Sequence, residues 1–476
     1  MSLPNDIDAV SISGGSSGGH CGYCNVSTEM KSSFGILCDT MKPETYLNLM
    51  NRGWRRCGTY FYKPANDTTC CPLYTIRCDA SNFELSKSQR TVLKSFRKFL
   101  ISGKEGIFKK KSANSNINAR GDEASVTDTL ANINENSLLK FGSGIKNDKS
   151  KKAKTIRFNR KLTKLKCQAE SESKSYDEIL ANYHQKRLKR QQKQKSKSLS
   201  EYLNYSDLVS PKHSLIIKTL RSHPEVKEFT ETKSEEHKIY TKYQCKIHND
   251  RPSEVDMKQF ERFLIKGGIY HNKTSDIIDL KNPKRNLPQG QYHQQYWLDG
   301  THLIAVGVID IVPNALSSVY LFYDPDYSFL NLGVFSALFE INFINELRMK
   351  YSDPDFRFYY MGFYTHQCTK MRYKAQYRGS MLLCPITYSW VDVKICQKIL
   401  DKSKFARFAA ESETDKYSLE NKSITQLSEL MNVIVSRKPF KLKRFLPQLS
   451  SDLIGTIEEF CKLVGSKILP NLKVVF

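Results

Sequence analysis

The chain has 476 residues and a mass of 54.9 kDa, more than one ordinary domain, and its hydrophobic content of 39% excludes a wholly disordered polymer. With 74 Lys and Arg against 49 Asp and Glu, its charge of +25 favours a polyanionic partner such as nucleic acid and argues against a basic one. No apolar run reaches the roughly 18 residues of a membrane helix, and the N-terminus lacks the features of a secretory signal. We therefore expect a cytoplasmic, and also nuclear, protein without a membrane partner.

The N-terminal segment is rich in cysteine. Seven of the thirteen Cys lie between positions 21 and 78, which predicts a compact Cys-rich module over residues 1–102. Near its end, Ser86 can cap a helix whose apolar face includes Val92 and Phe96, and Gly103 can end it.

A basic, low-complexity segment follows over residues 103–200. Residues 146–200 alone hold 18 Lys and Arg against 5 Asp and Glu. This composition predicts a linker or insertion that is partly helical or disordered. The segment is either a solvated tail or an arm that attracts RNA phosphates without reading sequence.

Regular structure resumes over residues 201–476, which predict a third domain. Its strands are expected to form an antiparallel meander, since Asp299-Gly300 and Pro313-Asn314 are turn signals. The Gly267-Gly268 pair is expected to end a helix in a left-handed turn. The order of strands, helix and strand predicts an α+β fold with an antiparallel or mixed sheet and packed helices. The predicted helices span 253–266, 331–351, 425–436 and 451–467, and the predicted strands span 295–298, 303–312, 318–323 and 356–364.

The cysteine spacing predicts a metal site. Cys21 and Cys24 have the C-x-x-C spacing that lets two thiolates hold one tetrahedral ion, and Cys70 and Cys71 can supply two more. Zinc and an iron–sulfur cluster both accept such ligands. Adjacent side chains diverge in extended backbone, so His20 or Cys78 can replace one of the adjacent pair. The alternative is two pairs of ordinary buried thiols.

Two motifs combine cations with aromatic rings. Arg55 and Arg56 follow Trp54, and guanidinium groups suit planar recognition of carboxylate or phosphate; the alternative is a basic strand with Trp54 in the core. The segment 364–377 interleaves cations with tyrosines, which can hold a phosphate and stack a base, or it forms a basic surface with inward-facing tyrosines. Its candidate side chains are His366, Lys370, Arg372, Tyr373 and Lys374.

Carboxylates at Asp299, Asp310 and Asp324 lie at strand ends or within apolar runs. Asp310 stands out because burial would raise the pKa of its carboxyl toward the range useful for a general base, although such residues are more often structural. The P-loop, zinc-protease, serine-hydrolase and kinase signatures are missing from the sequence, so neither ATP nor serine-hydrolase chemistry is expected. An acyl donor must therefore arrive already activated.

Several motifs in order closely resemble the eukaryotic arginyl-tRNA protein transferases. They cover about residues 18–100 and 235–395. The N-terminal motifs are Cys21-Gly-Tyr-Cys24, Arg52-Gly-Trp-Arg55-Arg56, Tyr60-Phe61-Tyr62-Lys63-Pro64 and Cys70-Cys71-Pro72-Leu73-Tyr74-Thr75-Ile76-Arg77, and the C-terminal ones are Tyr296-Trp297-Leu298-Asp299-Gly300, Ala305-Val306-Gly307-Val308-Ile309-Asp310, Ser317–Pro325 and Lys370-Met371-Arg372-Tyr373-Lys374. Cys57 departs from the family pattern, in which Ser is expected, and is therefore not expected to bind metal.

The resemblance implies transfer of arginine from arginyl-tRNA to the N-terminal α-amine of proteins that begin with Asp, Glu or oxidised Cys. It also implies ubiquitin-dependent degradation of the product, a downstream ubiquitin ligase, and a monomer whose C-terminal domain is GNAT-like. The pyrophosphate-binding loop of GNAT enzymes is missing, so coenzyme A is not expected as a cofactor.

The resemblance also gives the candidate residues their roles. We expect a cationic pocket for the acidic acceptor, in which losing one partner of a desolvated pair costs about 2 to 5 kcal/mol. A carboxylate is expected to select the arginine side chain of the donor. The expected catalytic residues are Asp310, Tyr320, Tyr373 and His366, and the expected substrate-binding residues are Trp54, Arg55, Arg56, Asp299, Asp324, Lys370, Arg372 and Lys374. The alternatives are a zinc-containing RNA-binding protein without activity and a transferase that uses acyl-CoA.

Overall fold

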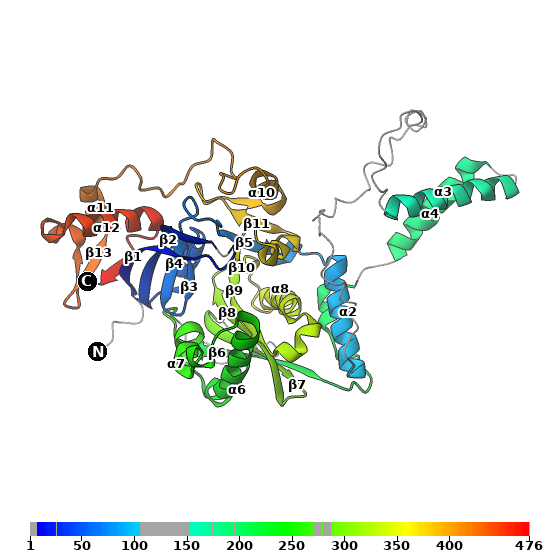
Figure 1. The fold of residues 1–476 in the computed structure, drawn as a ribbon, viewed down its shortest axis with the longest axis horizontal. Helices are drawn as coiled ribbons and strands as arrows, with labels where there is room; N and C mark the ends of the chain where they lie inside the picture. The colour runs from blue at the N-terminus through cyan, green and yellow to red at the C-terminus, as the bar shows by residue number, and fades with distance from the viewer. Residues whose placement is uncertain are drawn as a thin grey trace. The chain divides into compact units, whose positions relative to one another are not determined.

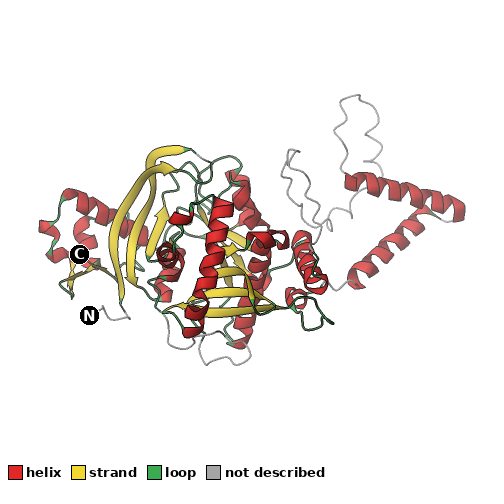
Figure 2. Cartoon of the chain, turned by 60° about the horizontal axis from the view of Figure 1, so that its bottom comes forward, coloured by secondary structure: helices red, strands yellow, loops and turns green. Residues whose placement is uncertain are grey.

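The computed structural model describes residues 7–24, 26–104, 153–172, 175–193, 197–270, 278 and 287–475. The chain divides into two compact units, one of Met1–Ile107 with Ser198–Phe476 and one of Phe108–Lys197. The larger unit contains two mixed sheets with helices packed on them, which confirms the α+β class (Figures 1 and 2). Among the described helices, none has the length and apolar character needed to cross a membrane.

The first sheet joins the two ends of the chain. Its strand order is β14-β13-β15-β1-β2-β4-β3, and β1 lies parallel to β15, with Asp8 opposite Leu472. Helices α1 (Pro43–Met50), α11 (Ile424–Leu430) and α12 (Ser451–Val464) contribute to a core on this sheet that includes Trp54 and Phe460. The strands are β1 (Asp8–His20), β2 (Ser27–Thr40), β3 (Arg55–Cys57), β4 (Tyr60–Pro64), β13 (Asn432–Val435), β14 (Lys438–Lys441) and β15 (Leu472–Val475).

The second sheet contains one strand from the N-terminal segment. Its order is β12-β11-β5-β10-β9-β8-β7-β6, so β5 (Tyr74–Asp79) lies between two strands that come about 280 or more residues later in the chain. The chain from 290 to 323 forms the predicted antiparallel meander, with Asp299 and Asn314 at positive φ in its turns. The other strands are β6 (Leu215–His223), β7 (Gly290–Leu298), β8 (His302–Val312), β9 (Ala315–Tyr323), β10 (Phe358–Tyr364), β11 (Ser380–Leu383) and β12 (Trp390–Asp392).

Helices cover both faces of the second sheet because its central strands are buried on both sides. Helices α8 (Leu332–Lys350) and α2 (Lys87–Ser102) pack on one face, where Phe96 stacks on Phe335. Helices α6 (Lys227–Tyr243) and α7 (Met257–Phe260) pack on the other, where Tyr240 meets Phe322 edge to face (Figure 1). The remaining short helices of this unit are α5 (Leu199–Leu203), α9 (Thr369–Arg372) and α10 (Val393–Leu400).

The predicted helix after Ser86 is confirmed together with both of its ends. The Ser86 hydroxyl accepts from the Gln89 amide in a reciprocal capping box, and Gly103 ends the helix at φ +64°. The prediction for Gly267 and Gly268 is wrong, because neither adopts positive φ. A Cβ at Gly267 would lie 2.1 Å from the terminal amide of Gln291, so a larger residue there would have to displace that buried side chain.

Two other helix predictions need correction. The predicted helix over 253–266 is broken into the 3-10 turn η4 (Pro252–Glu254), α7 and the π-helical turn η5 (Glu261–Ile265). The predicted helix over 425–436 ends at Leu430, and residues 432–435 form β13 instead. The run Asn432-Val-Ile-Val435 is rich in β-branched residues, which favour strands. It pairs with β15 instead of continuing the helix.

The smaller unit is a helical hairpin in its described part. Helix α3 (Ala153–Glu172) and helix α4 (Tyr176–Lys193) meet through a small apolar cluster of Leu165, Ala169 and Ile179. These helices account for part of the segment 103–200 for which we predicted a linker, and residues 105–152 of that segment lie outside the described residues.

Candidate metal centre and cationic substrate site

Four cysteines from two separate turns meet at one point. Cys21 and Cys24 lie in the turn of the β1–β2 hairpin, and Cys70 and Cys71 lie between β4 and β5. All four Sγ atoms lie within 4.8 Å of one another, and Cys24 Sγ is 3.5 Å from Cys70 Sγ. A tetrahedral ion with bonds of about 2.3 Å to sulfur needs thiolates about 3.8 Å apart, so this group fits a metal held by four Cys.

The adjacent pair Cys70 and Cys71 both belong to this group, which the argument from extended backbone did not favour. The chain bends at residues 69–71, so successive side chains need not point in opposite directions. Of the two expected substitutes, Cys78 lies in β5 and donates to the Arg378 carbonyl oxygen, and His20 contacts Ser27.

The four thiols affect one another electrostatically. Partial burial and the neighbouring Cys21 and Cys24 thiols raise the pKa of Cys70 to about 11. Burial opposes ionisation of Cys21 as well, but hydrogen bonds from the backbone at Cys24 and Tyr23 lower the pKa of its thiol to about 7. Four thiolates this close would repel one another strongly, and a bound cation removes that repulsion.

Arg55 is a buried cation without a carboxylate partner among the described residues. It lies on β3 with 5% of its surface exposed, and its Nη1 donates to the Trp54 carbonyl oxygen over 2.8 Å. Its Nε is buried without a hydrogen-bond partner, and burial lowers the pKa of the guanidinium. Aromatic rings surround the group, with Tyr360 and Phe363 centred 5.3 and 5.5 Å from its Cζ.

Lys374 brings a second cation to the same place. Its Nζ donates to the carbonyl oxygens of Met361 and Phe363, each over 2.8 Å. Burial, with a smaller contribution from the charge of Arg55, lowers the pKa of Lys374 to about 8. The two carbonyls belong to an irregularity in β10, where Gly362 has φ +68° and the register against β5 shifts. Arg55 and Lys374 therefore form a paired cationic site at this bulge.

Arg56 points away from that site and binds Asp310. Two hydrogen bonds join the guanidinium to the carboxylate, with Nε–Oδ2 at 2.8 Å, and both side chains are at most 1% exposed. The pair connects β3 of the first sheet to β8 of the second. Although burial opposes its charge, Asp310 raises the pKa of Arg56. In this conformation neither side chain has access to a substrate.

The other two candidate carboxylates also have partners. Asp299 lies in the β7–β8 turn, where it contacts His213 Nδ1 at 2.7 Å and accepts from the Ser214 amide. These contacts, led by the Ser214 amide, lower the pKa of Asp299. Asp324 forms an ion pair of 2.6 Å with Lys242. Asp299 therefore binds the chain at residues 213 and 214, and Asp324 binds helix α6.

His366 lies in a chain of polar groups. Its Nδ1 meets the Tyr364 hydroxyl at 2.8 Å and its Nε2 meets Asp401 at 2.9 Å, while Arg372 lies beside the same hydroxyl. This arrangement can move or hold a proton. Lys370 lies one turn away on the exposed side of α9.

The remaining candidates lie in different surroundings. Tyr320 donates to Gln244 over 3.0 Å, and burial raises the pKa of its phenol. Tyr373 is 41% exposed, whereas Trp54 is fully buried in the core of the first sheet.

One candidate group that the sequence analysis missed is Glu340 on α8. It is 1% exposed and accepts from the Tyr359 hydroxyl over 2.8 Å. Burial raises the pKa of its carboxyl to about 7. The sequence signal was a single acid inside the apolar run Leu338-Phe-Glu-Ile-Asn-Phe343, which is buried all round.

Known protein families match both the segment with the cysteine group and the segment with Lys374. Residues 19–91 match the profile of the family described as arginine-tRNA-protein transferase, N terminus, and residues 235–384 match the one described as its C terminus. The first range includes all four clustered cysteines and Arg55, and the second includes Lys374 and Glu340.

Individual relatives agree with the profiles. The chain is 32% identical to arginyl-tRNA–protein transferase 1 of Drosophila melanogaster, over 95% of this chain and 96% of the relative. It is 31% identical to arginyl-tRNA–protein transferase 2 of Arabidopsis thaliana, over 81% of this chain and 75% of the relative. A shorter match, 41% over 22% of this chain and 41% of the relative, is to an aspartate/glutamate leucyltransferase of Pseudomonas putida. The chain belongs to the arginyl-tRNA–protein transferase family.

Proposed function

We propose that this protein transfers arginine from arginyl-tRNA to the N-terminal α-amine of proteins that begin with Asp, Glu or oxidised Cys. The product is then recognised by a ubiquitin ligase and degraded. We place this activity in the cytoplasm and the nucleus. Membership of the family supports the transfer itself, and the cationic site at the β10 bulge supports the choice of acceptor.

The observation that carries the acceptor assignment is the pair of cations without a carboxylate. Arg55 and Lys374 repel one another, and burial weakens the hydration of both. An anionic side chain placed between them would relieve that repulsion and could accept from the unpartnered Nε of Arg55. Carboxylate and cysteine sulfinate or sulfonate both meet this requirement, whereas an uncharged first residue does not.

We place the donor where the pairing between β9 and β10 ends. The parallel register joins Phe358–Tyr360 to Ala315–Ser317, while the two strands continue to Tyr364 and Tyr323. A parallel pairing that ends before its strands do, in a sheet flanked by helices, supports a GNAT-like acyltransferase fold for the C-terminal part. The bulge at Gly362 lies just beyond Tyr360, the last residue of β10 that pairs with β9, and beside the cationic site.

The reaction requires alignment more than activation. The neutral α-amine forms a bond to the carbonyl carbon of the aminoacyl ester, and the bond from that carbon to the ribose oxygen breaks. The amine loses one proton and the ribose oxygen gains one. Arg55 and Lys374 hold the first residue of the acceptor, and we keep His366, Tyr320 and Tyr373 as candidates for the proton transfers. Because the ester is already activated, neither ATP nor coenzyme A is needed.

We propose that Cys21, Cys24, Cys70 and Cys71 hold zinc or an iron–sulfur cluster. When bound, either group stabilises the thiolates, and an iron–sulfur cluster adds sensitivity to oxygen. The residues themselves tie the β1–β2 turn to the loop that leads into β5, and β5 pairs with the bulged strand β10.

The test is transfer of labelled arginine from charged tRNA to peptides that differ only in their first residue, Asp, Glu, oxidised Cys or Ala. We expect labelling of the first three and not of the Ala peptide. Arg55→Gln should lower kcat/KM for the Asp peptide by about 30-fold or more, because a desolvated charge pair is lost. Arg444→Gln, at an exposed position on the short 3-10 turn after β14, is the matched control.

Lys374→Met provides a second variant if Arg55→Gln does not fold, as judged by circular dichroism. Equal labelling of the Ala peptide would overturn the acceptor assignment. Failure of all transfer by folded protein that binds charged tRNA would instead favour an RNA-binding protein without activity.

A further inference from the structure

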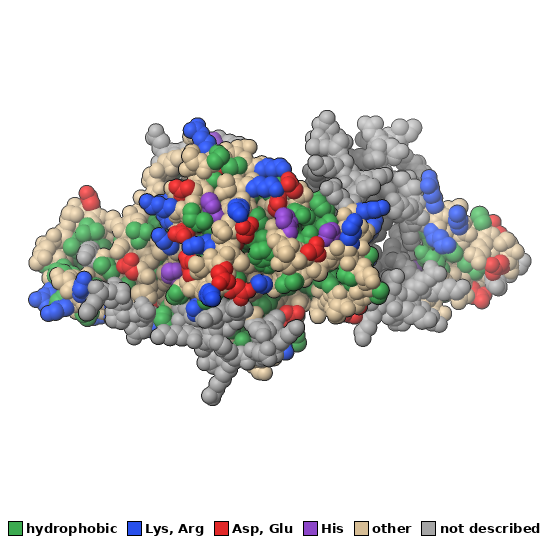
Figure 3. All heavy atoms as spheres, turned by 90° about the horizontal axis from the view of Figure 1, so that it is seen from below, with side chains coloured by type: hydrophobic (Ala, Val, Ile, Leu, Met, Phe, Trp, Pro, Cys, Tyr) green, Lys and Arg blue, Asp and Glu red, His purple; other side chains and the backbone are tan. Residues whose placement is uncertain are grey.

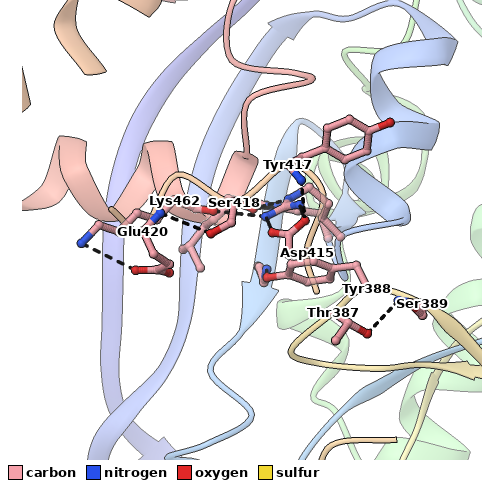
Figure 4. Close-up of polar contacts among 12 residues, drawn as sticks. Thr387, Tyr388, Ser389, Asp415, Tyr417, Ser418, Glu420 and Lys462 are labelled. Carbon is pink, nitrogen blue, oxygen red and sulfur yellow. Dashed lines mark hydrogen bonds and ion pairs between the residues drawn. The ribbon is translucent and has the colours of Figure 1, made fainter. Parts of the chain in front are cut away.

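A pocket adjoins the cationic site through Tyr360, whose ring centre lies 5.3 Å from Arg55 Cζ and 5.6 Å from the Trp390 ring. It has a volume of about 400 Å³ and is lined by α1 and the turn that follows it, by β5, and by three later segments at 387–390, 414–417 and 467–468. Figure 4 shows the Tyr388 ring beside Asp415, whereas Thr387 accepts from the Ser389 amide. All three later segments lie beyond residue 384, where the family profile ends. This volume suits a ligand of nucleotide size.

Aromatic rings from two segments line the pocket. The Tyr417 ring is 41% exposed and stands out from its turn in Figure 4. Two contacts hold the Trp390 ring in place. Its Nε1 donates to Asn51 Oδ1 over 3.3 Å, and the Arg77 guanidinium lies 3.9 Å from its ring centre. Tyr388 adopts φ +56°, a conformation that aromatic residues rarely adopt.

The pocket has an excess of positive charge. Arg52 is neutralised by Asp415, which accepts from both of its terminal nitrogens over 2.9 and 3.0 Å. Arg77, Lys416 and Lys467 also line the pocket, and within the described part of the chain none of them forms an ion pair. The Lys467 Nζ lies 5.7 Å from the Tyr417 ring centre and donates to Asn48. An anionic group can therefore bind beside an aromatic ring.

A neighbouring cavity provides a contrast. It has about 530 Å³ and shares Arg52 and Tyr388 with the first pocket, but three carboxylates, Asp67, Glu420 and Glu459, line it against two cations. A phosphate is therefore favoured in the first pocket and disfavoured in the second. The amide oxygens of Asn48 and Asn51 accept from Lys467 and Trp390, so their NH2 groups are left to donate to the polar edge of a base.

We propose that the pocket between Trp390, Tyr417 and Lys467 binds a nucleotide, with its base on an aromatic ring and its phosphate beside Lys467. Rings beside cations are the combination by which proteins hold unpaired nucleotides, since every base has a flat face and every phosphate a charge. The nucleotide is either free or part of an RNA chain. In the second case it belongs to the tRNA donor, and that assignment rests on the proposed function.

The tryptophans provide a direct test. Trp54 and Trp297 are buried, with 0% and 8% of their surfaces exposed, so quenching by an added ligand reports mainly on Trp390. We would titrate the full chain with AMP, CMP, a single-stranded RNA tetranucleotide and an acidic tetrapeptide. We expect saturable quenching by the nucleotides or the RNA, and its loss in Trp390→Phe.

Lys467→Ala retains the tryptophan signal and should weaken binding about fivefold or more, since one contact between a cation and a phosphate is removed. Lys438→Ala, at an exposed position on β14, is the matched control and should bind normally. Equal quenching by AMP and RNA identifies a free nucleotide as sufficient, and quenching by RNA alone identifies an RNA chain.

Quenching by the acidic peptide alone, or no quenching by any ligand, would overturn the proposal. An unchanged affinity in Lys467→Ala would overturn the placement of the phosphate. The assay needs no arginine transfer, so a failure of the proposed function would leave nucleotide binding in this pocket intact.

Discussion

Lys374 differs from an ordinary lysine because its amine can lose its proton near physiological pH. Its pKa is lowered to about 8, first by burial and second by Arg55. Above pH 8 the neutral amine can no longer neutralise an acidic first residue. The cationic site should therefore hold acidic acceptors tightly below pH 8 and weakly above it.

This property gives a prediction for the pH dependence of transfer. Between pH 7 and pH 9, the kcat/KM of the native protein for an Asp peptide should fall about tenfold relative to that of Lys374→Arg, whose guanidinium stays charged. Taking the ratio of the two proteins cancels the ionisation of the peptide amine. A ratio that stays constant with pH would show that the charge of Lys374 does not contribute to acceptor binding.

At the scale of elements, the position of the β1–β2 turn depends on the four-cysteine group that contains Cys21 and Cys24. Gly14, Gly18 and Gly19 have positive φ in β1, so the hairpin can bend toward the loop that carries Cys70 and Cys71. The four-cysteine group joins two turns that are far apart in sequence.

We therefore expect Cys24→Ser to lose most of the bound zinc or iron and to expose the turn to limited proteolysis. Cys57→Ser should retain full occupancy, because Cys57 is half-buried on β3 and lies outside the group. Elemental analysis of anaerobically purified protein and the rate of cleavage near residue 24 check both expectations. Full metal content in Cys24→Ser would contradict the four-cysteine assignment.

Local sequence patterns predicted most helices and strands. The features that they did not predict depend on contacts between residues far apart in sequence. The helix after Ser86 and the meander of β7 to β9 depend on capping and alternation, which are visible within a few residues. The cysteine spacing likewise predicted the cluster of four Cys that could hold a metal ion. In contrast, the pairing of Arg56 with Asp310 joins residues 254 positions apart, so the sequence analysis gave those two residues substrate and catalytic roles. Glu340 was missed because nothing local shows that α8 is covered on all sides.

At the scale of the whole molecule, the positive charge is divided unevenly. On the face shown in Figure 3, basic and acidic side chains of the larger unit are interspersed. Residues 146–200, nearly all in the smaller unit, hold 18 basic and 5 acidic residues. The smaller unit should therefore raise the affinity for tRNA through phosphate contacts that do not depend on sequence.

Replacing residues 108–197 with a short Gly/Ser linker tests this role. Helices α2 and α5, which flank the deletion, are already joined through Arg97, which donates to Asn204 and pairs with Asp207. We expect weaker tRNA binding at low salt, a shallower dependence of affinity on salt, and normal transfer at saturating tRNA. A second variant keeps the segment but replaces its Lys and Arg with Gln, which separates the effect of charge from that of length. Equal affinity of all three proteins at low salt would show that the unit does not attract RNA.

The position of β5 has a consequence for synthesis of the chain. This strand ends at Asp79, while its partner β10 begins at Phe358. At ribosomal rates of about 5 to 20 residues per second, the strand waits roughly 15 to 60 s for the partner that completes its hydrogen bonding. Throughout that interval both of its edges are open to pairing with other nascent chains. Yield in the cell should thus depend on chaperones that shield β5 until the C-terminal strands leave the ribosome.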